Sequence, residues 1–236
     1  MTEQDIGYTL KKYADFGTSE PWYARISVGL EEVIRALMIS ESEKQKMRDA
    51  LGEVSDELGA AFIALKKLRS LETNRNRTVL ELNREYSDFY DHLWRAYKDR
   101  FQTFCSTLGY SMGFLFENKD SFEKKSIQFI KNNPSISDRF RKRSKIFRRL
   151  WQNGLSDLRN LYIQHKQVGR EIEGLYYRVD VAERYFQEVW QAIEEISVSL
   201  LRTRIPLEMG IDIAEIPENQ RDRSCPKKYH FIMTKS

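Results

Sequence analysis

The sequence predicts an all-α protein: an elongated helical bundle with long antiparallel helices and a short irregular C-terminal extension. The 236 residues include only 11 glycines and 5 prolines, which favours long helices over a sandwich or barrel with frequent turns. Charged residues make up 31% of the chain and hydrophobic residues 41%, a balance typical of amphipathic helices rather than of a disordered chain.

The composition divides the chain into three regions. Residues 1–18 are polar with scattered aromatics and indicate an N-terminal arm, whereas residues 19–205 carry the helical patterns of the bundle. Residues 206–236 contain three prolines and, near the end, the stretch KKYHFIM, which indicates either one edge strand or a mobile tail.

The first two predicted helices are amphipathic. Ser19 and Pro21 mark the start of the first helix, because proline in the first turn loses no hydrogen bond. Ser40 and Glu43 have the spacing of a capping box, which opens the second helix. The apolar side of the first helix consists of Ile26, Leu30, Val33, Ile34, Leu37 and Met38. The second helix has a seam, spaced alternately by four and three, of Met47, Leu51, Val54, Leu58, Ala61, Leu65 and Leu68.

A third helix is predicted from Thr78 to Leu108, after a polar segment, TNRNR, at 73–77. That segment indicates a turn, with one helix running straight through it as the alternative. The third helix is rich in aromatic side chains, for which we expect packing rather than base stacking. Its predicted core residues are Phe101, Phe104 and Cys105. A shorter helix capped by Asp120 then ends near 133, where Pro134 forces a break.

Two more helices complete the predicted bundle. One runs from a cap at Ser135 or Ser137 to about Val168, with Gly169 as its terminator or as a weak point in a longer helix. The last helix is predicted from about 170 to 204. It carries an apolar stripe at spacings of three and four, consisting of Ile172, Leu175, Val179, Ala182, Phe186, Val189, Ile193, Ile196 and Leu200.

A basic run lies between Arg139 and Leu150. Seven of its twelve residues are Arg or Lys and none is acidic, although the whole chain carries only +4. Like charges repel at helical spacing, so the run predicts an anionic partner, RNA or another polyanion, with Phe140 and Phe147 as stacking surfaces. The alternative is a solvated face, or pairing with acidic segments such as 171–173 and 194–195. The candidate nucleic-acid-binding residues are Arg139, Arg141, Lys142, Arg143, Lys145, Arg148 and Arg149.

The next stretch, Trp151–Lys166, combines an arginine, an amide and a histidine. Arg159 precedes His165 by six residues, which on a helix places them about 120° apart in azimuth and about 9 Å apart in rise. A histidine can move the proton of an RNA 2′-hydroxyl, and an arginine can stabilise charge on the phosphoryl oxygens. Because RNA supplies its own nucleophile, this chemistry needs no metal.

Arg159, Asn160 and His165 resemble the R-x(4–6)-H signature of the HEPN superfamily, in which a polar residue commonly follows the arginine. The resemblance covers the motif and, loosely, the helices at 78–204. It implies a metal-independent endoribonuclease, a toxin or antiviral defence protein, that forms a homodimer and has an antitoxin or other protein partner. In that reading Arg159 holds the phosphate, His165 transfers protons and Asn160 orients the pair.

Other interpretations stay open. Some HEPN domains are non-catalytic, so a helical scaffold or assembly protein and a nucleic-acid-binding protein are the alternatives, with His165 as a core or interface histidine. Arg223 and His230 also fit the spacing, but Pro226 breaks that segment. The histidines lack Cys or His neighbours at ligand spacing, so we expect no metal and no cofactor. Cys105 and Cys225 read as reduced thiols of a cytoplasmic protein without a membrane-spanning run.

Overall fold

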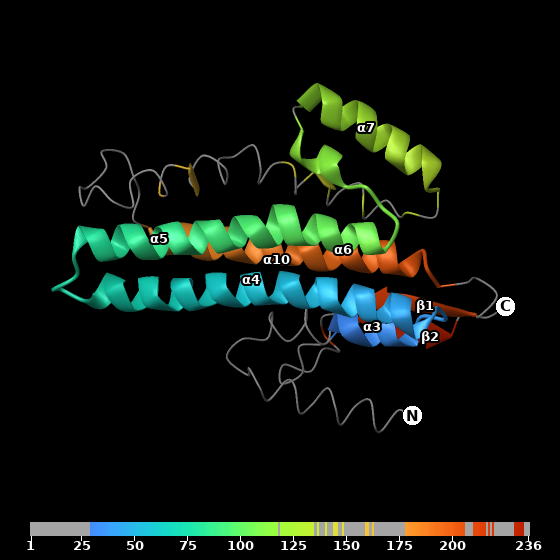
Figure 1. Cartoon of the computed structure of the whole chain (residues 1–236), viewed down its shortest axis with the longest axis horizontal. Coiled ribbons are helices and arrows are strands. Elements are labelled where there is room, and N and C mark those ends of the chain that lie inside the picture. The colour runs from blue at the N-terminus through green and yellow to red at the C-terminus, as the bar shows by residue number, and fades with distance from the viewer. Residues whose placement is uncertain are drawn as a thin grey trace, which may run out of the picture.

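The computed structural model describes residues 29–117, 119–134, 178–205, 210–215 and 229–233, with the single residues 136, 140, 144, 145, 148, 159, 160, 162, 217 and 219. The predicted arm at 1–18, most of the helix predicted from Ser135 or Ser137 to about Val168, and most of the extension after 205 lie outside these residues. Within them the predicted all-α fold is confirmed. Long helices form the body, and one small pair of strands lies at its side (Figure 1).

The predicted start of the first helix, at Ser19 and Pro21, lies outside the described residues. Helix α3 covers Leu30–Ala36, and Leu37 after it is extended. Met38 is therefore beyond the helix and 72% exposed, so its assignment to the apolar face was wrong. Helix α4 covers Glu41–Thr73 and starts with the predicted capping box, in which the Ser40 hydroxyl accepts a hydrogen bond from the Glu43 N–H.

Helix α4 turns back at 74–77 into helix α5, Val79–Trp94, so the predicted turn is confirmed and a straight helix through this segment is excluded. A second capping box, Thr78 with Glu81, opens α5. The predicted seam of α4, from Met47 to Leu68, is buried throughout and packs along α5 and its continuation. The two helices run antiparallel (Figure 1).

The continuation of α5 contains a π-helical segment that the sequence did not predict. Segment η2, Arg95–Arg100, follows α5 without a break and leads directly into helix α6, Phe101–Thr107. The predicted core residues Phe101, Phe104 and Cys105 are all fully buried. Burial of Cys105 raises the pKa of its thiol well above the ordinary value.

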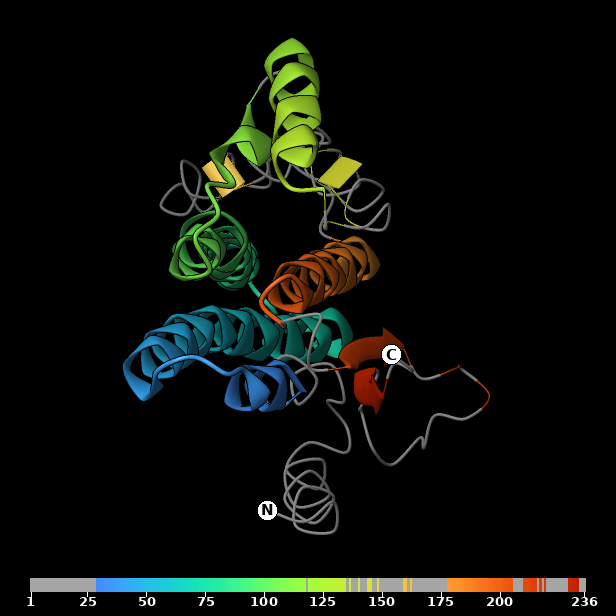
Figure 2. The same cartoon turned by 90° about the vertical axis from the view of Figure 1, so that its right-hand side faces the viewer.

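Helix α10, Val179–Arg202, is the third long element and packs against both α4 and the α5–α6 helix. Viewed along the bundle, the three form a triangle (Figure 2). An uninterrupted helix from about 170 was wrong, because Arg178 has extended dihedral angles and α10 begins after it. No helix among the described residues is both long and apolar enough to cross a membrane.

A separate layer lies on the far side of α5–α6 and α10 from α4 (Figure 2). It consists of the 3₁₀ turn η3, Gly113–Phe116, and helix α7, Lys119–Asn132, which ends before Pro134 as predicted. The C-terminal region forms two antiparallel strands, β1 (Ile211–Glu215) and β2 (Tyr229–Met233), so the expectation of a single strand or a tail missed β1. Ile213 is buried, and Arg202 of α10 pairs with Asp212.

Candidate functional site

Arg159, the arginine of the predicted motif, lies against α5. Its Nε and Nη2 both lie 2.9 Å from Oδ1 of Asp91. Its guanidinium also lies over the ring of Trp94, with 5.3 Å between the guanidinium carbon and the ring centroid. The Arg159 side chain is 28% exposed and that of Asp91 18%, so the ion pair is partly shielded from water. Two contacts from α5 therefore fix the direction of this arginine.

The two described residues that follow Arg159 differ in their exposure to solvent. Asn160 is exposed, and its Oδ1 lies 3.4 Å from Nη1 of Arg159. Tyr162 is buried and stacks on Tyr86 and Tyr90, with ring centroids 5.1 and 5.3 Å away. From Arg159 to Tyr162 the contacts thus move back along α5, from Asp91 and Trp94 to Tyr86 and Tyr90. His165, the third residue of the motif, lies outside the described residues.

Asp91 is shared between two arginines and so connects the motif to a larger ionic cluster. Arg95 Nη2 lies 2.5 Å from the second oxygen of Asp91, and Arg95 Nη1 lies 3.9 Å from Glu57 of α4. The other oxygen of Glu57 lies 2.7 Å from Nδ1 of His92. A carboxylate thereby orients the His92 ring, as in histidines that transfer protons. This pair was missed because its members are 35 residues apart in sequence.

The π-helical segment lies directly beside this cluster. Trp94 is the last residue before η2, and Lys98 within η2 places its Nζ 4.9 Å from the centroid of the Trp94 ring. Lys98 and Arg159 are therefore gathered around one aromatic ring. Short π segments inside α-helices occur frequently at functional sites. No sequence pattern signals such a segment, so Trp94 and Lys98 were predicted only as parts of an ordinary helix.

The basic run is represented by two of its seven cationic residues. Lys145 is exposed, as a phosphate-binding residue should be, whereas Arg148 is only 9% exposed. Phe140 is fully buried and stacks on Phe129 of α7 at 5.3 Å, so its assignment as a stacking surface for bases was wrong. The remaining cationic residues of the run, Arg139, Arg141, Lys142, Arg143 and Arg149, lie outside the described residues.

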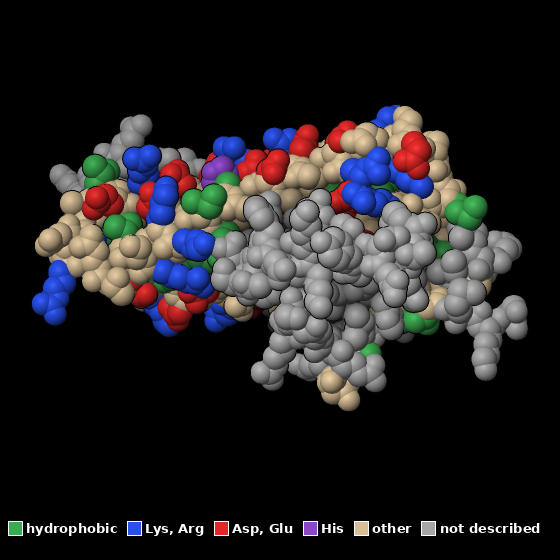
Figure 3. All heavy atoms as spheres, turned by 90° about the horizontal axis from the view of Figure 1, so that it is seen from below, with side chains coloured by type: hydrophobic (Ala, Val, Ile, Leu, Met, Phe, Trp, Pro, Cys, Tyr) green, Lys and Arg blue, Asp and Glu red, His purple; other side chains and the backbone are tan. Residues whose placement is uncertain are grey.

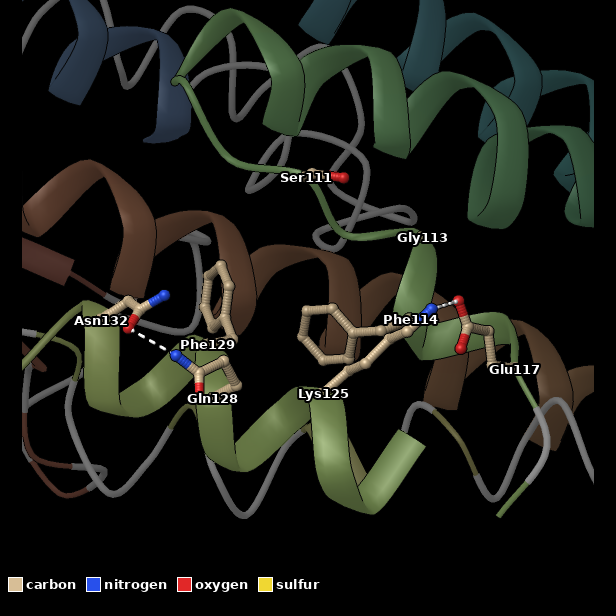
Figure 4. Close-up of a pocket in the computed structure, with 8 residues that line it drawn as sticks. All are labelled: Ser111, Gly113, Phe114, Glu117, Lys125, Gln128, Phe129 and Asn132. Atoms are coloured by element: carbon tan, nitrogen blue, oxygen red, sulfur yellow. Dashed lines mark hydrogen bonds and ion pairs between the residues drawn. The ribbon is translucent and has the colours of Figure 1, made fainter. Parts of the chain in front are cut away.

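A shallow pocket of about 320 Å³ lies between α7 and the segment that contains η3 (Figure 4). The rings of Phe114 and Phe129 form its apolar wall, with 5.2 Å between their centroids. Its polar side chains are largely paired with one another, since Lys125 lies 2.6 Å from a Glu117 oxygen and the Gln128 amide donates to Asn132. The pocket is lined by Ser111, Gly113, Phe114, Glu117, Lys125, Gln128, Phe129 and Asn132.

Charges of both signs lie on the described part of the face shown in Figure 3, where Lys and Arg side chains are found beside those of Asp and Glu. Among the described residues no group of three or more His, Cys, Asp or Glu side chains has the arrangement of a metal site. Comparison of the chain with protein-family models, curated proteins and solved structures gives no match.

Proposed function

We propose that this protein is a HEPN-like, metal-independent endoribonuclease that acts through Arg159, Asn160 and His165. The observation that carries the proposal is the fixed position of Arg159. Asp91 occupies its Nε and Nη2, and Trp94 lies beneath its plane. Of the five N–H groups of a guanidinium, two donate to Asp91 and one donates to exposed Asn160, which leaves two for phosphate oxygens.

In the proposed reaction the RNA 2′-hydroxyl attacks the adjacent phosphate. His165 takes the hydroxyl proton and returns a proton to the leaving oxygen, while Arg159 stabilises the negative charge that develops on the phosphoryl oxygens. Exposed cations of the basic run, such as Lys145, guide the RNA strand to the site. The proposal includes a homodimer, a role in toxicity or antiviral defence, and an antitoxin or other protein as partner.

A non-catalytic helical scaffold is the second candidate, and the same ion pair favours it. Asp91 and Arg159 are 68 residues apart in sequence, so their contact ties the segment around 159 to α5. The charges around Arg159 are also nearly balanced, because Asp91, Glu57 and Glu53 face Arg95 and Arg100. In this case Arg159 stabilises the bundle, and His165 packs in it or at an interface.

The experiment that separates the two candidates is RNA cleavage in the presence of a metal chelator. We expect purified protein to cut mixed RNA and leave 2′,3′-cyclic phosphate ends. His165→Ala is expected to lower the rate by about 10²–10⁴-fold, the usual contribution of a general acid or base. Arg159→Lys keeps the charge but loses the planar fork, and is also expected to lose activity.

His92→Ala is the matched control, because His92 belongs to the same ionic cluster through Glu57 and Arg95. Activity retained in His92→Ala but lost in His165→Ala supports the proposal. The reverse result would assign proton transfer to His92 and contradict the proposed role of His165. Intact RNA with every version, together with lower thermal stability of Arg159→Lys, supports the scaffold.

A further inference from the structure

Arg148 of the basic run is buried in spite of its charge. Its guanidinium lies over the ring of Phe122 on α7, with 5.0 Å between the guanidinium carbon and the ring centroid. Phe140 and Ser144, which precede Arg148 at helical spacings of eight and four, are buried as well. Phe140 packs on Phe129 at the other end of α7. The side chain of Arg148 is thus enclosed between its own segment and α7.

The edge of this guanidinium that usually binds an oxyanion has no hydrogen-bond partner among the described residues. Nε and Nη2 of Arg148 are both buried without an acceptor. These two nitrogens point to the same side, with the spacing of two oxygens of a carboxylate or phosphate. Elsewhere in the described residues, carboxylates bind this same edge of Arg35, Arg159, Arg178 and Arg202.

Phe122 does not replace such an acceptor. A ring over the face of a guanidinium attracts its positive charge, but it accepts no hydrogen bond from the N–H groups at the edge. Burying a charged donor without an acceptor is costly, and buried charges in proteins are normally paired. The acidic residues nearest to Phe122 on α7, Asp120 and Glu123, are both exposed. A bound anion would remove the cost.

We propose that Arg148 forms the base of a binding site for a phosphate group, carried by inorganic phosphate or by a mononucleotide. A phosphate group suits this site better than a carboxylate, because its charge approaches −2 at neutral pH. The run from Arg139 to Leu150 holds seven cations and no acid, and this net positive charge favours a doubly charged anion over a singly charged one. Both nitrogens of the fork are buried, which favours a small anion over an RNA backbone. This site is separate from Arg159 and does not depend on the proposed function.

The test is the thermal unfolding of the full chain in sodium phosphate and in sodium chloride at equal ionic strength. A ligand that binds only the folded protein raises its Tm, and we expect a rise of at least about 3 °C at saturating phosphate. Arg148→Met should abolish the rise, and Arg148→Lys, which keeps the charge but lacks the fork, should abolish most of it. Lys145→Met is the matched control, because it removes an exposed charge of the same run and should keep the rise.

The stability order of the variants gives a second readout. In chloride, Arg148→Met should be at least as stable as the wild type, because an uncompensated buried charge is gone; in phosphate the order should reverse. An equal phosphate response of the wild type and a folded Arg148→Met would overturn the proposal, as would the absence of any response in the wild type. If Arg148→Met does not fold, Arg148→Lys and calorimetric titration of phosphate into the wild type decide instead.

Three further ligands identify what the site recognises. Adenosine 5′-monophosphate should stabilise the wild type as phosphate does, whereas adenosine should have no effect. Stabilisation by adenosine alone would place recognition in the base and contradict the proposal. Stabilisation by single-stranded RNA but not by phosphate would make Arg148 part of a polyanion surface and equally contradict a small-anion site.

Discussion

The ion pair between Asp91 and Arg159 permits a quantitative prediction. Both nitrogens of the Arg159 edge lie 2.9 Å from Asp91, and both side chains are less than one third exposed. Fully exposed pairs contribute about 0.2–1 kcal/mol, whereas hydrogen bonds to charged groups contribute about 1.5–3 kcal/mol. For this partly shielded pair we expect a coupling free energy of about 1–2 kcal/mol.

A double-mutant cycle measures this coupling. Asp91→Ala, Arg159→Met and the double variant are unfolded in urea, and the cycle separates the Arg159 contact from the one that Asp91 makes with Arg95. For a chain of this size, about 1 kcal/mol corresponds to about 2–4 °C in Tm. Loss of the Arg159 contact alone should therefore lower the Tm by about 2–8 °C, and Asp91→Ala, which also loses the contact with Arg95, should lower it by at least as much.

The pair Arg84–Asp88 on the same helix is the control. Its charged atoms lie 3.9 Å apart and the Arg84 side chain is 69% exposed, so we expect its coupling to be below about 0.5 kcal/mol. A coupling between Asp91 and Arg159 no larger than that of the control would refute the reasoning. It would show that the contact does not hold Arg159 in place, and the observation that carries the proposed function would be lost.

Two predictions concern the fold. Gly109 has a φ of +83°, and a Cβ at this position would lie 2.9 Å from the guanidinium of Arg204, which donates a hydrogen bond to the Leu108 carbonyl. Gly109→Ala should therefore destabilise the protein by about 1–3 kcal/mol. Gly52→Ala, in the open interior of α4, should instead stabilise by about 0.5–1 kcal/mol in the same urea titration, and an equal loss in both would contradict this view. Hydrogen bonds from Thr78 lower the pKa of Glu81 in the folded protein below its ordinary value of 4.5. The ionised Glu81 therefore stabilises the fold fully above pH 4.5, and this stabilisation is lost as the pH falls through the lower pKa of the folded state. Between about pH 5 and 3 the Tm should fall less steeply in Glu81→Gln, which retains the capping geometry without the charge; parallel pH profiles would argue against this role of Glu81.

The parts of the fold that the sequence predicted correctly are those governed by local signals. The capping box at Ser40 and the seam from Met47 to Leu68 depend only on residues within a few turns of each other. Strand β1 was missed because its alternation, Ile211 and Ile213, is too short to stand out. The break at Arg178 carries neither glycine nor proline, and its extended backbone has no signature in sequence.

The candidate site divides in the same way. A spacing rule selected Arg159 and Asn160 as candidates, because both residues belong to one short motif. Their supporting partner Asp91 comes from α5, and only the folding of distant segments onto each other brings them together. The sequence predicted both Arg148 and Phe140 as residues that contact nucleic acid, whereas both are buried against α7. Their burial results from the packing of their segment on α7, which residue type alone does not signal.

The π-helical segment η2 determines how far α6 is rotated about the helix axis relative to α5. Its bonds close on the fifth preceding residue instead of the fourth, so the faces of α5 and α6 are rotated relative to those of one regular helix. If the same residues formed regular α-helical turns, α6 would be turned by about 100° relative to α5. Either Asp91 and Trp94 would then leave Arg159, or Phe101 and Phe104 would leave the core. The π-helical conformation of this segment is thus required from both sides, even where its side chains can be replaced.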